Sequence, residues 1–269
     1  MKRAQDHGAD FEHAPAVADA GSFDRFPHGV VKITYRSDAD GREDWALAVP
    51  GENPLGIGIV VLHGHGSGGD QFFTWKQLGD GRDFLSRLRC GILSPDLRGN
   101  AWMCPEAVED LAKLMIFAKK RFKWRKIILA SGSMGGTGGL IFASHHPELV
   151  DAVVALGAAT DLASYVSWCG RQKLEVCGRI AEAIRTAYKN DRELMKSHSS
   201  LARYENLTIP VWLCHGVADE IIPVSQARRL AGKMAEFPDF VYREVWRGDH
   251  DSPMLSFIEC VSQAIFTVF

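Results

Sequence analysis

Apolar and polar positions follow two different rhythms along the chain from residue 29 onward. Short apolar runs rich in β-branched residues are continuous, as expected of strands that are buried on both faces. They lie at residues 56–63, 91–96, 126–130, 151–159, 209–215 and 240–246. Between them, apolar residues recur at every third or fourth position, which predicts helices. These stretches are residues 71–89, 105–122, 133–146, 223–237 and 252–269. The alternation predicts parallel strands joined by crossover helices in one α/β domain.

Two segments depart from this alternation. Residues 30–37 and 45–50, separated by the turn pair Asp40-Gly41, predict an antiparallel hairpin ahead of the parallel strands. Residues 160–206 hold two helical stretches and no strand, and we expect them to form a small helical cap inserted in the domain. The predicted fold class is therefore α/β, with a mostly parallel twisted sheet, helices on both faces and this cap.

The polar N-terminus and the composition narrow the class of protein. Residues 1–28 are expected to form a leader ahead of a domain at 29–269, and acidic residues interrupt any apolar signal-peptide core there. The 269 residues are 46% hydrophobic, enough to bury a core without disulfides. A net charge of −2 argues against a nucleic-acid partner. The chain shows no apolar run long enough for a membrane span, which predicts a protein with no membrane partner.

The cysteines favour a reducing compartment. The six cysteines stand singly in apolar stretches and form no C-x-x-C pair, which indicates buried thiols and a cytoplasmic protein. A bridge between Cys169 and Cys177 is the alternative.

The strongest local motif is residues 131–136, Ser-Gly-Ser-Met-Gly-Gly, where a predicted strand turns directly into a predicted helix. A nucleophilic serine at such an elbow needs small residues two positions away on each side, because the strand and the helix nearly touch. Gly135 meets this need, and Ser131 stands where a glycine is usual. The Ser133 hydroxyl would project above the sheet, and the Met134 amide would face an anionic intermediate. The alternative is a glycine-rich turn that serves packing alone.

A serine hydroxyl needs a base and a residue that orients the base. His250 follows the last predicted strand and Asp219 follows the penultimate one, so both are expected at the carboxyl edge of the sheet. The chain order Ser, Asp, His is typical of one class of α/β hydrolytic enzymes. Asp161 also follows a predicted strand and is the alternative acid, although its position before a helix favours a capping role.

Four stretches carry a resemblance to known proteins, namely VVLHGHGSGG (60–69), SPDLRGN (94–100), ASGSMGG (130–136) and PVWLCHGVADEIIPVSQARRL (210–230). From about residue 45 to the C-terminus the chain resembles the α/β-hydrolase superfamily, and more narrowly its prolyl-oligopeptidase-like and dienelactone-hydrolase-like members. The resemblance implies Ser133 as nucleophile, Asp219 as acid and His250 as base. It also implies an oxyanion hole built from the Met134 and His65 amides. The chain carries no sequence for a propeller domain, which argues against an oligopeptidase activity.

These features predict a serine hydrolase that cleaves an acyl bond through a covalent acyl-enzyme, without a metal or an organic cofactor. A carboxylic ester of a small molecule is the expected substrate, and an aminopeptidase or amidase of prolyl-oligopeptidase type is the alternative. In the predicted cap, Tyr165 and Trp168 are expected to line the substrate pocket or else to fill the core of the cap. The sequence does not indicate an oligomeric state.

A second motif gives a different hypothesis. Gly64, Gly66 and Gly69 match G-x-G-x-x-G after a strand, and Asp96 ends the next strand, as in NAD(P)-dependent oxidoreductases. The spacing from Gly69 to Asp96 exceeds the ~20 residues that this motif usually shows. This hypothesis also leaves Ser133, Asp219 and His250 unexplained. A further alternative, a noncatalytic binding protein, leaves the same residues unexplained.

The remaining histidines are expected to be structural. His63 and His215 each precede a glycine at the end of a strand, where an imidazole commonly supports a loop by hydrogen bonding. No histidine pair has the H-x-x-x-H or H-E-x-x-H spacing of a metal site.

Overall fold

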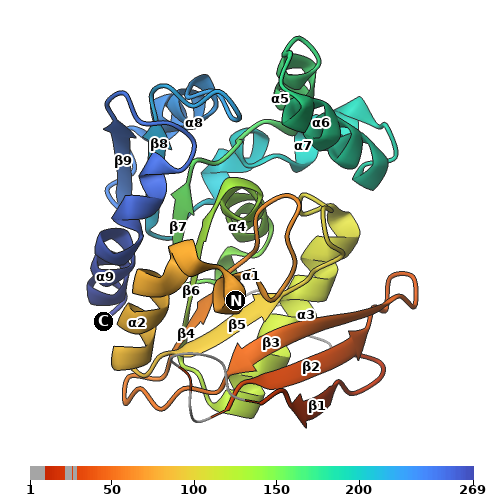
Figure 1. The fold of residues 1–269 in the computed structure, drawn as a ribbon, viewed down its shortest axis with the longest axis vertical. Coiled ribbons are helices and arrows are strands. Elements are labelled where there is room, and N and C mark those ends of the chain that lie inside the picture. Colours follow the sequence, from red (N-terminus) through yellow and green to blue (C-terminus); the bar gives the residue numbers. More distant parts are fainter. Residues whose placement is uncertain (1–9, 22–25, 27–28) are drawn as a thin grey trace, which may run out of the picture.

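The fold is built on one mixed sheet of nine strands in a computed structural model that describes residues 10–21, 26 and 29–269 (Figure 1). The strands are β1 (Ala16–Asp19), β2 (Val31–Arg36), β3 (Glu43–Val49), β4 (Ile57–Val60), β5 (Gly91–Pro95), β6 (Lys126–Gly132), β7 (Ala152–Leu156), β8 (Val211–Gly216) and β9 (Phe240–Val245). Their order across the sheet is β1-β2-β3-β5-β4-β6-β7-β8-β9. From β5 to β9 neighbouring strands are parallel, which confirms the predicted fold class.

The predicted hairpin forms the antiparallel end of the sheet. β2 and β3 pair from Val31 opposite Ala48 to Arg36 opposite Glu43, and β3 then pairs antiparallel with β5. Every second residue of β2 is exposed, whereas every residue of β4, β5 and β7 is buried. This difference arises because helices cover both faces of the central strands only.

Part of the segment that we expected to be a leader belongs to the sheet. β1 pairs antiparallel with β2, and the Phe11 ring lies 5.3 Å from the Tyr35 ring between centroids. The physical reason is that β2 would otherwise present an unpaired edge, and the short segment with Val17 supplies a partner for it. The rest of the expected leader, residues 1–9, 22–25 and 27–28, lies outside the described residues.

Helices form a layer on each face of the sheet. On one face lie α1 (Gln71–Thr74), η1 (Lys76–Leu78), α2 (Gly79–Arg87), η4 (Ser252–Ser256) and α9 (Phe257–Thr267). On the other lie α3 (Pro105–Phe122), α4 (Ser133–His145), η2 (Pro147–Leu149) and α8 (Ser225–Met234). Each layer buries its own apolar cluster against the sheet. None of the helices in the described part of the chain is long and apolar enough to cross a membrane.

The helix predicted at residues 71–89 is broken in two. Trp75 takes an extended conformation between α1 and η1, so the chain turns before α2 begins at Gly79. The buried Arg82 guanidinium donates to the carbonyls of Phe72 and Trp75, which supplies partners that the helix would otherwise have provided. The prediction was wrong here because a tertiary contact replaced the continuing helix.

The expected cap lies between β7 and β8 and holds more helix than predicted. It comprises α5 (Leu162–Cys169), α6 (Glu175–Ala187), α7 (Arg192–His198) and the 3₁₀ segment η3 (Ser200–Asn206), in place of two helical stretches. Tyr188 is buried and its hydroxyl lies within hydrogen-bonding distance of the carbonyls of Trp102 and Met103, at 3.1 and 2.9 Å. The segment therefore packs on the same apolar cluster as α3 and α4. All six cysteines are buried free thiols.

Candidate active site

Ser133 lies at the sharp turn between β6 and α4, as the motif predicts. It has a φ of 55°, a left-handed conformation that is costly for a residue with a side chain. A Cβ on Gly135 would lie only 2.2 Å from the Leu62 carbonyl oxygen, so only glycine fits there. Ser131, which replaces the usual glycine, accepts a hydrogen bond from the Leu62 amide at 2.8 Å. The Ser131 side chain thus connects the elbow by a hydrogen bond to the chain just after strand β4.

The structure brings together the three residues that the sequence proposed as a triad. His250 Nε2 lies 2.9 Å from Ser133 Oγ, and His250 Nδ1 lies 2.7 Å from Asp219 Oδ2. A carboxylate only accepts, so Nδ1 carries the proton and Nε2 is free to accept the serine proton. The side chain of Asp219 is fully buried and that of His250 is 15% exposed. This arrangement can activate a serine hydroxyl.

Asp219 is held as a carboxylate by the loop around it. Its Oδ1 accepts from the amides of Ile221 and Ile222, both at 2.8 Å. Burial raises the pKa of this carboxyl, but the hydrogen bonds from His215 and His250 outweigh burial and hold the pKa well below its ordinary value. The group therefore remains charged at neutral pH, which is the state that an orienting acid needs.

His215 belongs to this network, and the sequence indicated only its supporting role. Its Nε2 lies 2.8 Å from the Ile222 carbonyl oxygen and 3.2 Å from Asp219 Oδ2, and the side chain is fully buried. Because a carbonyl cannot donate, Nε2 carries a proton that both oxygens share. The spacing of four residues between His215 and Asp219 was the available signal, but only the loop geometry brings the two side chains together.

Asp161 is not part of this network. Its carboxylate caps α5 by accepting from the Ser164 amide at 3.1 Å, and it pairs with Arg229 at 2.9 Å. The alternative acid is thus engaged as a helix cap.

The loop that carries His65 is held firmly on both sides. The Gly64 amide donates to Gln71 Oε1 and the Gly66 amide to Asn100 Oδ1, each at 2.7 Å. Gly66 has a φ of 84°, which a turn of this shape requires. Met134, the other expected oxyanion donor, is the second residue of α4, where amides have no acceptor within the helix.

The side chains of His63 and Asp96 both form hydrogen bonds with this loop. The nitrogens of His63 lie 2.8 Å from the carbonyl oxygens of Gly64 and Asp96, so this imidazole supports the loop as expected. Asp96 Oδ1 accepts from the Gly69 amide at 3.2 Å. The carboxylate that a dinucleotide would need is thus bonded to the glycine-rich loop itself.

Tyr165 and Trp168 do not line the cavity next to Ser133, and of the two roles that the sequence left open they take the packing role in the apolar cluster. Tyr165 is fully buried and its hydroxyl donates to the Ile221 carbonyl at 2.9 Å, while Trp168 stacks on it with ring centroids 6.1 Å apart. The reason is that α5 turns these rings toward the apolar cluster under the cap. Tyr165 instead supports the loop that carries Asp219.

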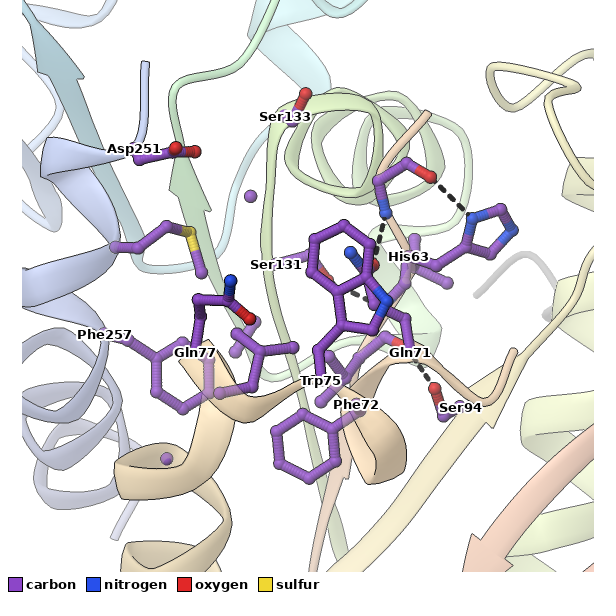
Figure 2. A pocket seen from close by; sticks show the side chains of 18 of the residues that line it. His63, Gln71, Phe72, Trp75, Gln77, Ser94, Ser131, Ser133, Asp251 and Phe257 are labelled. Carbon is purple, nitrogen blue, oxygen red and sulfur yellow. Dashed lines mark hydrogen bonds between the residues drawn. The ribbon is translucent and has the colours of Figure 1, made fainter. Parts of the chain in front are cut away.

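A cavity of about 450 Å³ opens beside Ser133 and His250 on the face of the sheet that carries α2 and α9. Figure 2 shows Phe72, Trp75 and Phe257 around this space below Ser133. The sequence does not single out these residues, because no local pattern separates a cavity wall from a core.

Comparison with known proteins agrees with this arrangement. The sequence profile of a family described as alpha/beta hydrolase fold matches residues 59–173. The structure superposes on an S-formylglutathione hydrolase from Agrobacterium tumefaciens with a TM-score of 0.68, at 14% identity over 97% of this chain and 100% of that one. The chain has the α/β-hydrolase fold. The resemblance stated from the sequence motifs is thereby confirmed at the level of fold.

Two further similar proteins are informative. FphF, a fluorophosphonate-binding serine hydrolase of Staphylococcus aureus, has a TM-score of 0.64 at 14% identity, over 89% of this chain and 97% of that one. Human protein ABHD8 is 23% identical, over 64% of this chain and 47% of the human protein. The chain thus spans about half the length of the curated relatives that it matches.

Proposed function

We propose that this α/β-hydrolase protein is a serine hydrolase that cleaves a carboxylic ester through a covalent acyl-enzyme. The observation that supports it most is the unbroken hydrogen-bonded series from Ser133 Oγ through both nitrogens of His250 to Asp219. The esterases and other hydrolases that share the fold support the same reaction class.

The proposed reaction begins when Ser133 Oγ attacks the ester carbonyl carbon and its proton passes to His250 Nε2. Asp219 stabilises the imidazolium through the Nδ1 proton, and its low pKa keeps it charged for this purpose. The amides of Met134 and His65 would donate to the oxyanion of the tetrahedral intermediate.

Collapse of that intermediate breaks the ester bond, and His250 Nε2 returns the proton to the departing alkoxide. Water then attacks the acyl-enzyme with Nε2 again as the base, and the carboxylic acid leaves as Ser133 recovers its proton. The chain's own residues thus supply every proton transfer of the proposed cycle.

The decisive experiment is active-site labelling with a fluorophosphonate, since an activated serine attacks phosphorus as it attacks a carbonyl carbon. The wild-type protein should be labelled at Ser133 and should hydrolyse nitrophenyl esters. Ser133→Ala should lose the label and lower the turnover number by about 10⁴-fold or more.

The matched control is Ser131→Gly, which restores the usual motif residue two positions away. It should remain labelled and active, although the Leu62 amide loses its side-chain acceptor. Equal turnover of wild type and Ser133→Ala would refute the proposal. Hydrolysis of aminoacyl anilides but not esters would shift it to an amidase.

A further inference from the structure

The cavity beside Ser133 has a buried inner part and an exposed mouth. Phe72 and Ala130 form the inner wall together with Phe257, and all three are buried. At the mouth, Trp75 is 46% exposed and Leu255 is 90% exposed. An apolar wall thus continues from the solvent to the interior, with the nucleophile at its edge.

Three polar side chains of the inner wall each make a hydrogen bond within the protein. Ser94 Oγ donates to the Val61 carbonyl at 3.1 Å, and Ser131 Oγ accepts from the Leu62 amide at 2.8 Å. Gln71 Oε1 accepts from the Gly64 amide. Most of the surface that a ligand meets in the cavity is apolar, and an apolar chain gains free energy by leaving water there.

The charged residues around the cavity restrict the charge of the ligand that it can bind. None of the described residues that line the cavity is a lysine or an arginine. Asp80 and Asp251 are its two carboxylates, and both are exposed at the mouth. An anionic chain would be repelled by them, and a buried ammonium would find no acidic partner among the inner residues.

The cavity beside Ser133 is large enough for a chain, whereas a second space beside Trp102 and Met134 has a volume of only about 20 Å³. At ~30 Å³ for each water-sized group, the larger cavity of about 450 Å³ holds on the order of fifteen such groups. Part of this volume is the exposed mouth beside Trp75 and Leu255, so the buried part holds a shorter chain.

We propose that this cavity binds the acyl chain of the substrate, and that the chain is uncharged, aliphatic and of medium length, about six to ten carbons. This inference rests on the proposed function, because the ester carbonyl must reach Ser133 while its chain extends between α2 and α9. The substrate class is thus a medium-chain acyl ester.

One glycine gives the means to shorten the cavity. A Cβ on Gly81 would lie 3.2 Å from the Phe257 ring and 4.0 Å from the Phe72 ring, so a side chain there enters the space between the two walls. Gly79 belongs to the same helix, does not line the cavity, and has only the Arg82 guanidinium within 4 Å of its Cβ position. Gly81→Leu and Gly79→Leu therefore form a matched pair.

The experiment measures kcat/KM for nitrophenyl esters from acetyl to dodecanoyl. Wild type should gain about threefold for each added methylene until the cavity is full. Gly81→Leu should lower kcat/KM for the octanoyl ester at least tenfold, leave the acetyl ester within about twofold and move the optimum to shorter chains. Gly79→Leu should keep the wild-type profile. A glutaryl ester should be hydrolysed at least tenfold less efficiently than the pentanoyl ester of equal length.

Labelling by a small fluorophosphonate distinguishes failure of the proposed hydrolase function from failure of the acyl-cavity proposal. If wild type neither takes the label nor hydrolyses any ester, the proposed function fails. The acyl cavity is refuted if wild type takes the label and hydrolyses the acetyl ester but hydrolyses the octanoyl ester with the same kcat/KM. It is also refuted if Gly81→Leu and Gly79→Leu show the same dependence of kcat/KM on chain length. Should Gly81→Leu not fold, Trp75→Ala replaces it. A lower octanoyl-to-acetyl ratio then supports the cavity, and an unchanged ratio overturns it.

Discussion

At the scale of single residues, two aspartates that both follow strands have different environments. Asp219 accepts hydrogen bonds from two backbone amides and two imidazoles. Asp161 caps a helix and pairs with Arg229. The difference lies in what surrounds each carboxylate and not in its position after a strand.

This contrast gives a prediction for the two asparagine variants. Asp219→Asn should lower the turnover number for ester hydrolysis by about 10⁴-fold, because the amide no longer fixes and stabilises the protonated imidazole. Asp161→Asn should keep its turnover and lose at most about 1 kcal/mol of unfolding free energy, since asparagine also caps helices. Steady-state kinetics and urea unfolding of both variants check this. A nearly inactive Asp161→Asn beside an active Asp219→Asn would contradict the assignment.

At the scale of elements, α4 depends on how closely its first turn approaches the sheet. The Cβ of an alanine at position 135 would lie 2.2 Å from the Leu62 carbonyl oxygen, and this backbone atom cannot move away without disturbing β4. At Gly139, one turn further on, the nearest atom is 3.7 Å away, an ordinary contact. The same helix thus contains a glycine that the fold requires and one that it tolerates.

We therefore predict opposite results for the same substitution. Gly135→Ala should lower the free energy of unfolding by about 3 kcal/mol or more, or prevent folding, because the overlap forces strand and helix apart. Gly139→Ala should be neutral or stabilise the protein by up to about 1 kcal/mol, as expected for alanine in a helix interior. Thermal and urea unfolding measure both. Equal stability of the two variants would show that the close approach at the elbow is absent.

At the scale of the whole molecule, Arg98 connects parts of the fold that are distant in sequence. Its guanidinium donates to Asp110 of α3 at 2.6 Å and to Asp40 of the hairpin turn at 2.8 Å, and only 8% of its side chain is exposed. Its backbone amide donates to Asp44 Oδ2 at 2.6 Å. The loop that carries Arg98 also positions Asn100 against Gly66. The antiparallel end of the sheet is thus fixed to the loop beside the candidate active site.

Removal of this cation should be costly at neutral pH. Burial raises the pKa of Asp110, and hydrogen bonds from Ser37 and Arg98 only partly oppose it. Arg98→Met would leave a buried carboxylate unpaired and should cost about 3–5 kcal/mol at pH 7.5.

The pH dependence of this loss has a definite sign. A carboxyl whose pKa is raised by folding binds a proton in the folded state before it does in the unfolded state, so the penalty decreases as the pH falls. Urea unfolding should therefore show a smaller difference between wild type and Arg98→Met at pH 5.5 than at pH 7.5. Arg36→Met, at an exposed pair with Glu43, serves as the control and should change stability by less than about 1 kcal/mol at either pH. A pH-independent loss in Arg98→Met would contradict the role of Asp110.

The amino-acid sequence by itself determined the features that local chemistry and order can express. The alternation of apolar runs and helical stretches predicted the parallel sheet, and Asp40-Gly41 predicted the hairpin. The order Ser133, Asp219, His250 predicted which side chains meet, because parallel strands end at the same edge of a sheet. These predictions succeeded because strand direction and turn chemistry depend on near neighbours in the chain.

The tertiary structure alone decided features that depend on packing between distant segments. The helical pattern at residues 71–89 does not show the break at Trp75, which Arg82 stabilises from the following helix. The sequence also does not show that Tyr165 packs into the apolar cluster. Nor does it show that the cavity lies between α2 and α9. Only the fold sets Gly81 opposite Phe257, across 176 residues of chain. An apolar residue in a helix has the same pattern whether it fills a core or lines a cavity, because periodicity specifies a face and the facing element decides what that face meets.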